Sequence, residues 1–237
     1  MTEIGAYWER AAATYDEEPD HGLRDPSVRA AWAARLRSWL PDGPSGVVDL
    51  GCGTGSLSVL AAAQGHRVTG IDLAPAMVRR ARAKGVTALR GDVSAPPFRR
   101  HAADVVLARH VAWMLPDPPT ALARWVSLLR PGGRLVLIEG RWGPVADGAA
   151  VDTDAPVDTD APVDTWRADT AAALPWDGGV RADDLRAAVR SLVDTVSVEV
   201  LDDPALWGRP VRDERYALLA RAPQTQVASH IRACHCE

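Results

Sequence analysis

The amino-acid sequence predicts an α/β protein with a doubly wound, seven-stranded sheet that is mostly parallel and carries helices on both faces. Through the middle of the chain, short apolar runs alternate with amphipathic stretches of about ten residues, which is typical of a parallel sheet. After the fifth run come a helix, a strand, a turn-rich segment at 202–213 and a last strand. This ending predicts a C-terminal hairpin with one antiparallel strand.

The expected strands are short runs rich in branched apolar residues, at 47–50, 67–72, 86–90, 104–108, 135–138, 196–201 and 216–220. Helices are expected where apolar residues recur at helical spacing, at 4–13, 26–40, 56–64, 75–84, 118–129 and 182–193. Asp25-Pro26 is a helix start, because Asp favours the N-cap position and Pro the first helical position. Three tryptophans at helical spacings, Trp32, Trp39 and Trp125, are expected in the core.

The chain divides into three predicted parts. Residues 1–45 form an N-terminal helical lid and a first helix, residues 46–222 form the ligand-binding core, and residues 223–237 form a loose tail. Inside the core, residues 151–165 carry an imperfect six-residue repeat that is acidic, contains proline and has little apolar surface to bury. This composition predicts a mobile loop, either a tolerated insertion or a lid.

Composition and charge narrow the possible partners. The formal net charge of -4 argues against a nucleic-acid partner, which would favour a basic surface. We see neither a signal peptide nor an apolar run long enough to span a bilayer, so we expect a cytoplasmic protein without a membrane partner. Cys234-His235-Cys236 offers too few ligands for a closed metal site, so no metal is expected. The sequence leaves the oligomeric state open.

The segment Asp49-Leu50-Gly51-Cys52-Gly53-Thr54-Gly55 carries the functional signal. A strand leads directly into three glycines at alternate positions, and a helix follows. Glycine permits positive φ and a close approach of ligand to backbone, and a helix N-terminus presents unpaired amides. A dinucleotide site needs the spacing G-x-G-x-x-G, which is absent here, and Asp49 ahead of the loop would repel a diphosphate. The pattern therefore favours a phosphate-free nucleoside with a cationic end over NAD.

These residues resemble the first motif of the class I S-adenosylmethionine-dependent methyltransferases, which have a Rossmann-like fold, and most of all the small-molecule group with the ubiquinone and menaquinone methyltransferases. Three further elements follow at the family's spacing, at 68–72, 91–93 and 129–135. The resemblance implies S-adenosylmethionine as the cofactor, with Asp72 on its ribose hydroxyls and Asp92 beside its adenine. Around it, the resemblance places Tyr15, Asp49, Gly51, Cys52, Gly53, Leu73, Met77, Val93, Ala108 and Arg109.

The segment after the fourth strand should face the donor or the acceptor, because ligands bind at the carboxyl ends of the strands in such sheets. His110 could take a proton from a hydroxyl or a protonated amine, and His21 on the lid is a second candidate base. Each histidine could instead only shape the pocket. Three other tryptophans could wall the acceptor or pack in the core: Trp113, Trp142 and Trp176.

One departure from the family lies at Ala74, where relatives often have a capping Ser or Asp, so the helix after it should lack a side-chain cap. The sequence predicts a biosynthetic enzyme that methylates an oxygen or nitrogen atom of a small metabolite. The alternatives are a methyltransferase acting on RNA or protein and a non-catalytic relative that only binds the nucleoside. A sulfonium methyl is already activated, so the site mainly aligns the reactants, and a base is needed only if the nucleophile must lose a proton.

Overall fold

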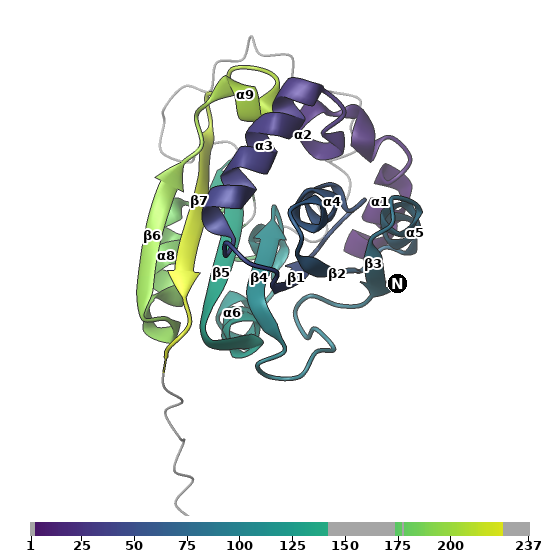
Figure 1. Cartoon of the computed structure of the whole chain (residues 1–237). Coiled ribbons are helices and arrows are strands. Elements are labelled where there is room, and N and C mark those ends of the chain that lie inside the picture. Colours follow the sequence, from purple (N-terminus) through teal and green to yellow (C-terminus); the bar gives the residue numbers. More distant parts are fainter. Residues whose placement is uncertain (1–2, 142–173, 177, 225–237) are drawn as a thin grey trace, which may run out of the picture.

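The computed structural model describes residues 3–141, 174–176 and 178–224 (Figure 1). Three features singled out in the sequence lie outside the described residues: Trp142, the repeat at 151–165 and Cys234-His235-Cys236. A seven-stranded sheet in the order β3-β2-β1-β4-β5-β7-β6 forms the centre of the fold. Its strands are β1 (Gly46–Leu50), β2 (Arg67–Asp72), β3 (Thr87–Arg90), β4 (Ala103–Arg109), β5 (Leu129–Arg141), β6 (Thr195–Val200) and β7 (Glu214–Arg221).

The strand pairing confirms the predicted fold class. Strands β1 to β5 are paired in parallel, and β7 runs antiparallel to both of its neighbours, β5 and β6. The order reverses at β1, since the chain first builds outward through β2 and β3 and then returns to β4 on the other side. In open α/β sheets this reversal point, at the carboxyl ends of the strands, is where ligands bind.

The helices cover both faces of the sheet, as predicted. Their bounds are α1 (Glu3–Ala11), α2 (Pro19–Gly22), α3 (Pro26–Trp39), α4 (Ser56–Ala63), α5 (Pro75–Ala83), α6 (Pro118–Ser127), α8 (Ala182–Val189) and α9 (Pro204–Trp207). Figure 1 shows α3 and α4 on one side of the sheet and α6 and α8 on the other. The Asp25 side chain accepts the amides of Ser27 and Val28 at 2.7 and 3.1 Å, so α3 starts as the Asp-Pro signal predicts.

Two stretches differ from the sequence-based expectation. The helix expected to reach residue 129 ends at Ser127, and β5 starts at Leu129 because the amide of Ala103 donates to the carbonyl oxygen of Leu128 at 3.0 Å. The segment 202–213, which was expected to contain only turns, contains the short helix α9. Its start, Asp203-Pro204, repeats the same signal that begins α3, and the Asp203 side chain accepts the Ala205 amide at 3.0 Å.

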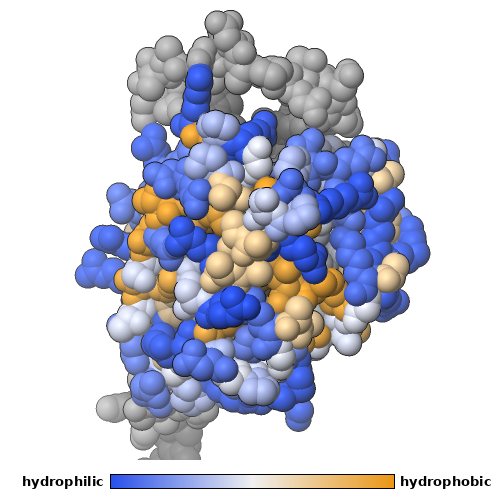
Figure 2. Space-filling view, turned by 45° about the horizontal axis from the view of Figure 1, so that its top comes forward, coloured by the Kyte–Doolittle hydropathy of each residue, from blue (hydrophilic) through white to orange (hydrophobic). Residues whose placement is uncertain are grey.

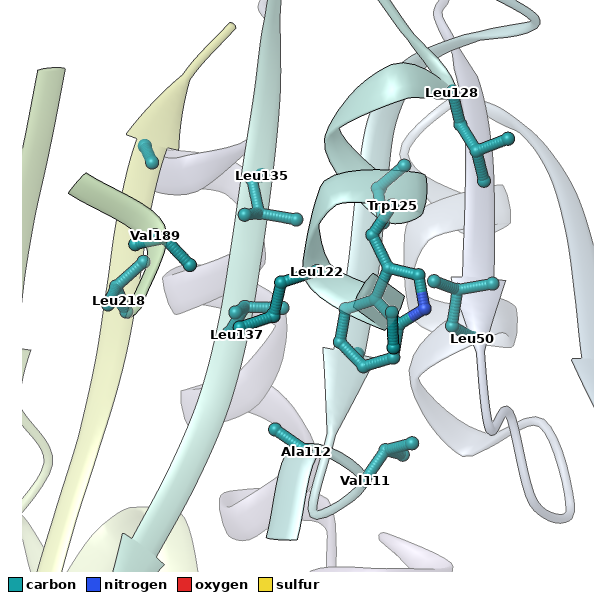
Figure 3. Close-up of a cluster of buried hydrophobic side chains, with 14 of the residues drawn as sticks. Leu50, Val111, Ala112, Leu122, Trp125, Leu128, Leu135, Leu137, Val189 and Leu218 are labelled. Atoms are coloured by element: carbon teal, nitrogen blue, oxygen red, sulfur yellow. The ribbon is translucent and has the colours of Figure 1, made fainter. Parts of the chain in front are cut away.

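Alternate residues of the central strands face opposite sides of the sheet. Val105 and Leu107 of β4 pack in the cluster that contains α3, α4 and α9, while Val106 and Ala108 pack in the cluster with α6 and α8. Figure 3 shows the second cluster, in which Trp125 of α6 lies between the strands and its own helix. The three tryptophans expected in the core are buried, which confirms that prediction: Trp32 and Trp39 lie in the first cluster and Trp125 in the second.

A glutamate replaces the missing cap of α5. It comes from the segment ahead of α3, residues 3–25, which is called the lid below. As predicted, Ala74 makes no side-chain hydrogen bond at this helix start. Glu9 of α1 instead accepts the Ala76 amide through Oε2 at 2.6 Å and pairs through Oε1 with Arg79 at 3.0 Å. The hydrogen bond from Ala76, helped by Arg79, holds the pKa of Glu9 below its ordinary value against the opposing effect of burial. The lid helix is therefore held to the α/β core through a helix N-terminus.

We expect Glu9→Ala to lower the melting temperature at neutral pH, because the Ala76 amide then loses its acceptor. A depressed folded-state pKa means that the stabilisation is present above the ordinary glutamate pKa of about 4.3 and is lost as the pH falls through the folded value. The difference between wild type and variant should therefore shrink in thermal melts taken toward about pH 3. Glu17→Ala, at an exposed position of the same lid, is the control. An equal effect in both variants would contradict capping by Glu9.

Candidate functional site

A cavity of about 650 Å³ lies at the carboxyl ends of β1, β2 and β4. Its wall brings together most of the residues that the sequence analysis proposed, from the lid, the glycine loop, β2, α5 and the segment after β4. They are Tyr15, His21, Gly51, Gly53, Asp72, Leu73, Met77, Asp92, Val93, Arg109 and His110. The cavity therefore lies at the reversal point of the sheet, where such folds bind ligands.

Three proposed residues have a different place. Asp49 and Cys52 line a neighbouring small cavity of about 20 Å³, and Ala108 is fully buried in the core. The Ser58 hydroxyl donates to Asp49 at 2.6 Å, and burial raises the pKa of this carboxyl to about 6. Burial also raises the pKa of the Cys52 thiol, which makes it a poor nucleophile.

The glycine loop needs its first glycine for two reasons. Gly51 has φ +68°, and a Cβ there would lie 2.4 Å from Cγ2 of Val111 in the loop after β4. Gly53 has φ +54° and lies under Tyr15, whose ring would be 3.5 Å from a Cβ at that position. Any larger residue at position 51 would push the two loops apart.

Asp72 faces the glycine loop from the end of β2. Its Oδ2 accepts the Gly53 amide and its Oδ1 the Ala74 amide, each at 2.9 Å. Burial raises the pKa of Asp72, and these amides oppose the rise. A carboxylate has about four acceptor sites, so two amides leave capacity for a pair of ribose hydroxyls. With Asp92 on the same wall, this end of the cavity fits a phosphate-free nucleoside such as that of S-adenosylmethionine.

The only lysine of the chain fastens the lid over the glycine loop. Lys84, at the end of α5, pairs with Asp16 of the lid at 2.8 Å and donates to the Thr54 hydroxyl at 3.0 Å. Thr54 in turn donates to the other oxygen of Asp16. Burial raises the pKa of Asp16, but Lys84 and Thr54 outweigh it and the net pKa is lowered. The sequence analysis missed this clasp, because its members lie far apart in the chain.

The two candidate bases are half-buried in the cavity wall. The His21 ring stacks on Tyr15 with centroids 4.3 Å apart, and burial lowers its pKa to about 4 although Asp20 lies beside it. The His110 ring stacks on Trp207 at 6.2 Å, and burial followed by nearby arginines lowers its pKa well below 6.5. Both rings are therefore neutral at neutral pH, and the lowered pKa makes each a weaker base than an ordinary histidine.

Glu139, which the sequence analysis missed, holds the segment that follows His110. Its Oε1 accepts the amides of Val111 and Ala112 at 2.8 and 2.7 Å, while burial raises its pKa to about 8. The available signal was an acid that directly follows the apolar run of β5. Glu139 acts on the site through the backbone that it positions.

The remaining wall is apolar with a basic rim. Trp113 lines the cavity together with Trp8, Val111 and Met114, which is one of the two places that the sequence allowed for it. Trp176 instead packs against the core clusters. Figure 2 turns the top of the view in Figure 1 forward and shows hydrophobic residues gathered among hydrophilic ones on that face. Two cavity residues that the sequence analysis missed come from the C-terminal segment: Arg209 and Arg215.

Between residues 3 and 224, leaving out 142–173 and 177, no His, Cys, Asp and Glu side chains gather in groups of three or more that could hold a metal ion. Within the same ranges, no helix combines the length and apolarity needed to cross a membrane.

A doubly wound sheet with a glycine loop and acids around a cavity at its reversal point defines a Rossmann-like nucleoside-binding protein. Residues 48–137 match the family described as "Methyltransferase domain". Nocamycin O-methyltransferase of Saccharothrix syringae is 36% identical over 185 residues, which cover 68% of this chain and 66% of that enzyme. Trans-aconitate 2-methyltransferase of Methylobacterium radiotolerans is 37% identical over 128 residues, which cover 52% of this chain and 48% of that enzyme.

Among solved structures, a possible histamine N-methyltransferase of Thermotoga maritima matches with a TM-score of 0.61 and 17% identity, covering 92% of this chain and 98% of that one. This likeness shows the fold. The chain contains a class I S-adenosylmethionine-dependent methyltransferase domain, and S-adenosylmethionine is its cofactor. The chain spans about two thirds of the length of the nocamycin enzyme and about half of the trans-aconitate enzyme.

We expect Lys84→Met to destabilise the protein by roughly 1–3 kcal/mol, because it leaves the carboxylate of Asp16 buried without its cation. The cost is below that of a fully buried pair, since the Lys84 side chain is 31% exposed. The affinity for S-adenosylhomocysteine should fall as well, since the lid is no longer fastened.

The double variant Asp16→Asn with Lys84→Met removes both charges and should be more stable than Lys84→Met alone. Denaturant unfolding and calorimetry measure the two effects, with Arg37→Met on the exposed side of α3 as the control. Additive losses in the double variant would show that the two residues do not act as a pair.

Proposed function

We propose that this protein transfers the methyl group of S-adenosylmethionine to an oxygen atom of a small metabolite. The observation that carries the proposal is one continuous cavity, with the glycine loop and Asp72 at one end and an apolar, basic wall at the other. The nocamycin relative, by its name, is an O-methyltransferase, which supports oxygen as the acceptor. Transfer to nitrogen is the second candidate that the sequence left open.

Each part of the site has a role in this proposal. Gly51, Gly53, Asp72 and Asp92 hold the donor, and Tyr15 covers it from the lid. The bound donor supplies a methyl group already activated by the sulfonium. The chain's own residues align the acceptor with that methyl, which can supply about 7–11 kcal/mol of barrier reduction, and the fastened lid excludes water.

The narrower predictions of the sequence analysis remain predictions. They include membership of the ubiquinone and menaquinone group, a role in biosynthesis, a cytoplasmic location, and the boundaries at residues 45, 46, 222 and 223. The absence of nucleic-acid and membrane partners also stays a prediction. A protein or RNA acceptor would be large, and the cavity of about 650 Å³ favours a small one.

The proposal is tested by binding and by transfer. The protein should bind S-adenosylhomocysteine and not NAD in calorimetry, and it should move labelled methyl from the donor into a small-metabolite extract. Asp72→Asn should weaken binding of S-adenosylhomocysteine by about 1.5–3 kcal/mol, or roughly 10- to 150-fold, because it loses charged hydrogen bonds. Asp42→Asn, at an exposed position, is the matched control. Preference for NAD, or binding with no transfer into any fraction, would contradict the proposed function.

We expect His110 to position the acceptor, since the lowered pKa of its ring makes it a weak base. His110→Asn also tolerates the φ of +57° at this position, so it should keep most of the turnover, while His110→Ala lowers it. A general base would instead make both variants slower by about 10²–10⁴. Turnover of the wild type should show no loss on acidification near pH 6.5, the ordinary histidine value. Melting temperatures of both variants check that the loop still folds.

A further inference from the structure

Two arginines from the C-terminal segment form one end of the cavity. Arg215 is held in place, since its Nε and Nη2 donate to Asp213 at 2.9 and 2.7 Å and its Cζ lies 4.5 Å from the centre of the Trp207 ring. Its side chain is only 13% exposed. Arg209 lines the same cavity from an exposed position nearer the solvent. One oriented, nearly buried guanidinium and one exposed guanidinium thus face the same space.

Acids also stand on this part of the wall, since Asp213 pairs with Arg215, and Asp20 and Glu18 line the same cavity. Asp20 lies 3.7 Å from His21, and Glu18 is exposed on the lid. Arg109 adds a third guanidinium, whose Nη1 donates to the Asp20 carbonyl oxygen at 2.6 Å. Because Arg109 also lines the small cavity beside the glycine loop, it belongs with the donor end. Arg209 and Arg215 then face the acceptor.

The neighbouring wall is apolar. Trp8 and Met114 are in contact through the indole N–H and the thioether sulfur at 3.2 Å, and Val111 and Trp113 continue the same wall. A molecule that fills this space needs an apolar body with an anionic group directed at the arginines.

Resting on the proposed methyl transfer, we propose that the acceptor is a carboxylic acid with an apolar body, whose carboxylate is bound by Arg215 and Arg209 and leaves as its methyl ester. A guanidinium matches a carboxylate in charge and in geometry, and it is a preferred residue for such recognition. An ammonium acceptor would place a further cation among the arginines. A neutral alcohol would form no ion pair with Arg209 or with the guanidinium that Asp213 orients.

The reaction balances without a base. A lone pair of the carboxylate oxygen forms the new O–CH₃ bond, and the C–S bond breaks with its electrons remaining on sulfur. One negative and one positive charge cancel, giving a methyl ester and S-adenosylhomocysteine, and no proton is released. The lowered pKa of His21 and of His110 makes each ring a weak base, which suits a reaction that releases no proton.

The test separates the acceptor class by charge and by product. A small-metabolite extract is divided by ion exchange into acidic, neutral and basic pools, and each is incubated with protein and methyl-labelled donor. Label should enter the acidic pool and be released as methanol by mild alkali, because methyl esters hydrolyse there while methyl ethers and methylamines do not. Label that arises from another pool, or that resists alkali, would overturn the inference.

The arginine variants give a second readout. Arg215→Gln and Arg209→Gln should each raise the amount of the acidic pool needed for half-maximal transfer by at least about tenfold, the value of one charged contact. Their affinity for S-adenosylhomocysteine should stay at the wild-type value, and Arg186→Gln on the exposed side of α8 should change neither quantity. If both cavity variants reached half-maximal transfer at the wild-type amount of the acidic pool, the assignment of Arg215 and Arg209 to carboxylate binding would be overturned. If the wild type did not bind S-adenosylhomocysteine, or if no pool took up label, the result would count against methyl transfer itself. The inference about the acceptor would then fall with it.

Discussion

The close contact between the glycine loop and the segment after β4 sets the geometry of the whole site. Glu139 holds the amides of Val111 and Ala112, and this places the Val111 side chain where only a glycine fits at position 51. The donor loop and the loop that carries His110 are therefore held at one separation. A buried carboxyl on the neighbouring strand thus controls how the two halves of the cavity face each other, although it is not part of the described wall.

The lid depends on the same core through two polar contacts of different kinds. Glu9 caps the start of α5, and Lys84 at the end of that helix pairs with Asp16. Both ends of α5 are thus used to hold the segment that carries Tyr15 and His21. Ala12 of the lid also packs on the buried Ala74 and Met77, so apolar contacts hold the lid to the core as well.

Charge divides the cavity into two ends. In the proposed complex, Asp72 and Asp92 face the donor, while Arg209 and Arg215 face the acceptor; all four line the same cavity. Trp207 links this second end to the core, because it contacts Arg215, His110 and the buried Trp32. In our proposal these two arginines bind an anion that needs no deprotonation. Burial, followed by the charges of Arg109 and Arg215, lowers the pKa of His110.

Local signals determined the sheet, its helices on both faces and the donor end, because alternating periodicity, glycine spacing and strand-terminal acids are all readable within short segments. The same reading missed α9, although Asp203-Pro204 repeats the signal of α3, since the surrounding turn residues concealed a helix of only four residues. Glu139, the Lys84 clasp and the arginines of the acceptor end join residues far apart in the chain. Their roles depend on which strands are neighbours and on which side chains are buried together. The sequence by itself therefore determined the class of fold and the cofactor that it implies. The tertiary structure decided which charged side chains share the cavity and why the pKa values of His21 and His110 are lowered, because burial and long-range neighbours control both.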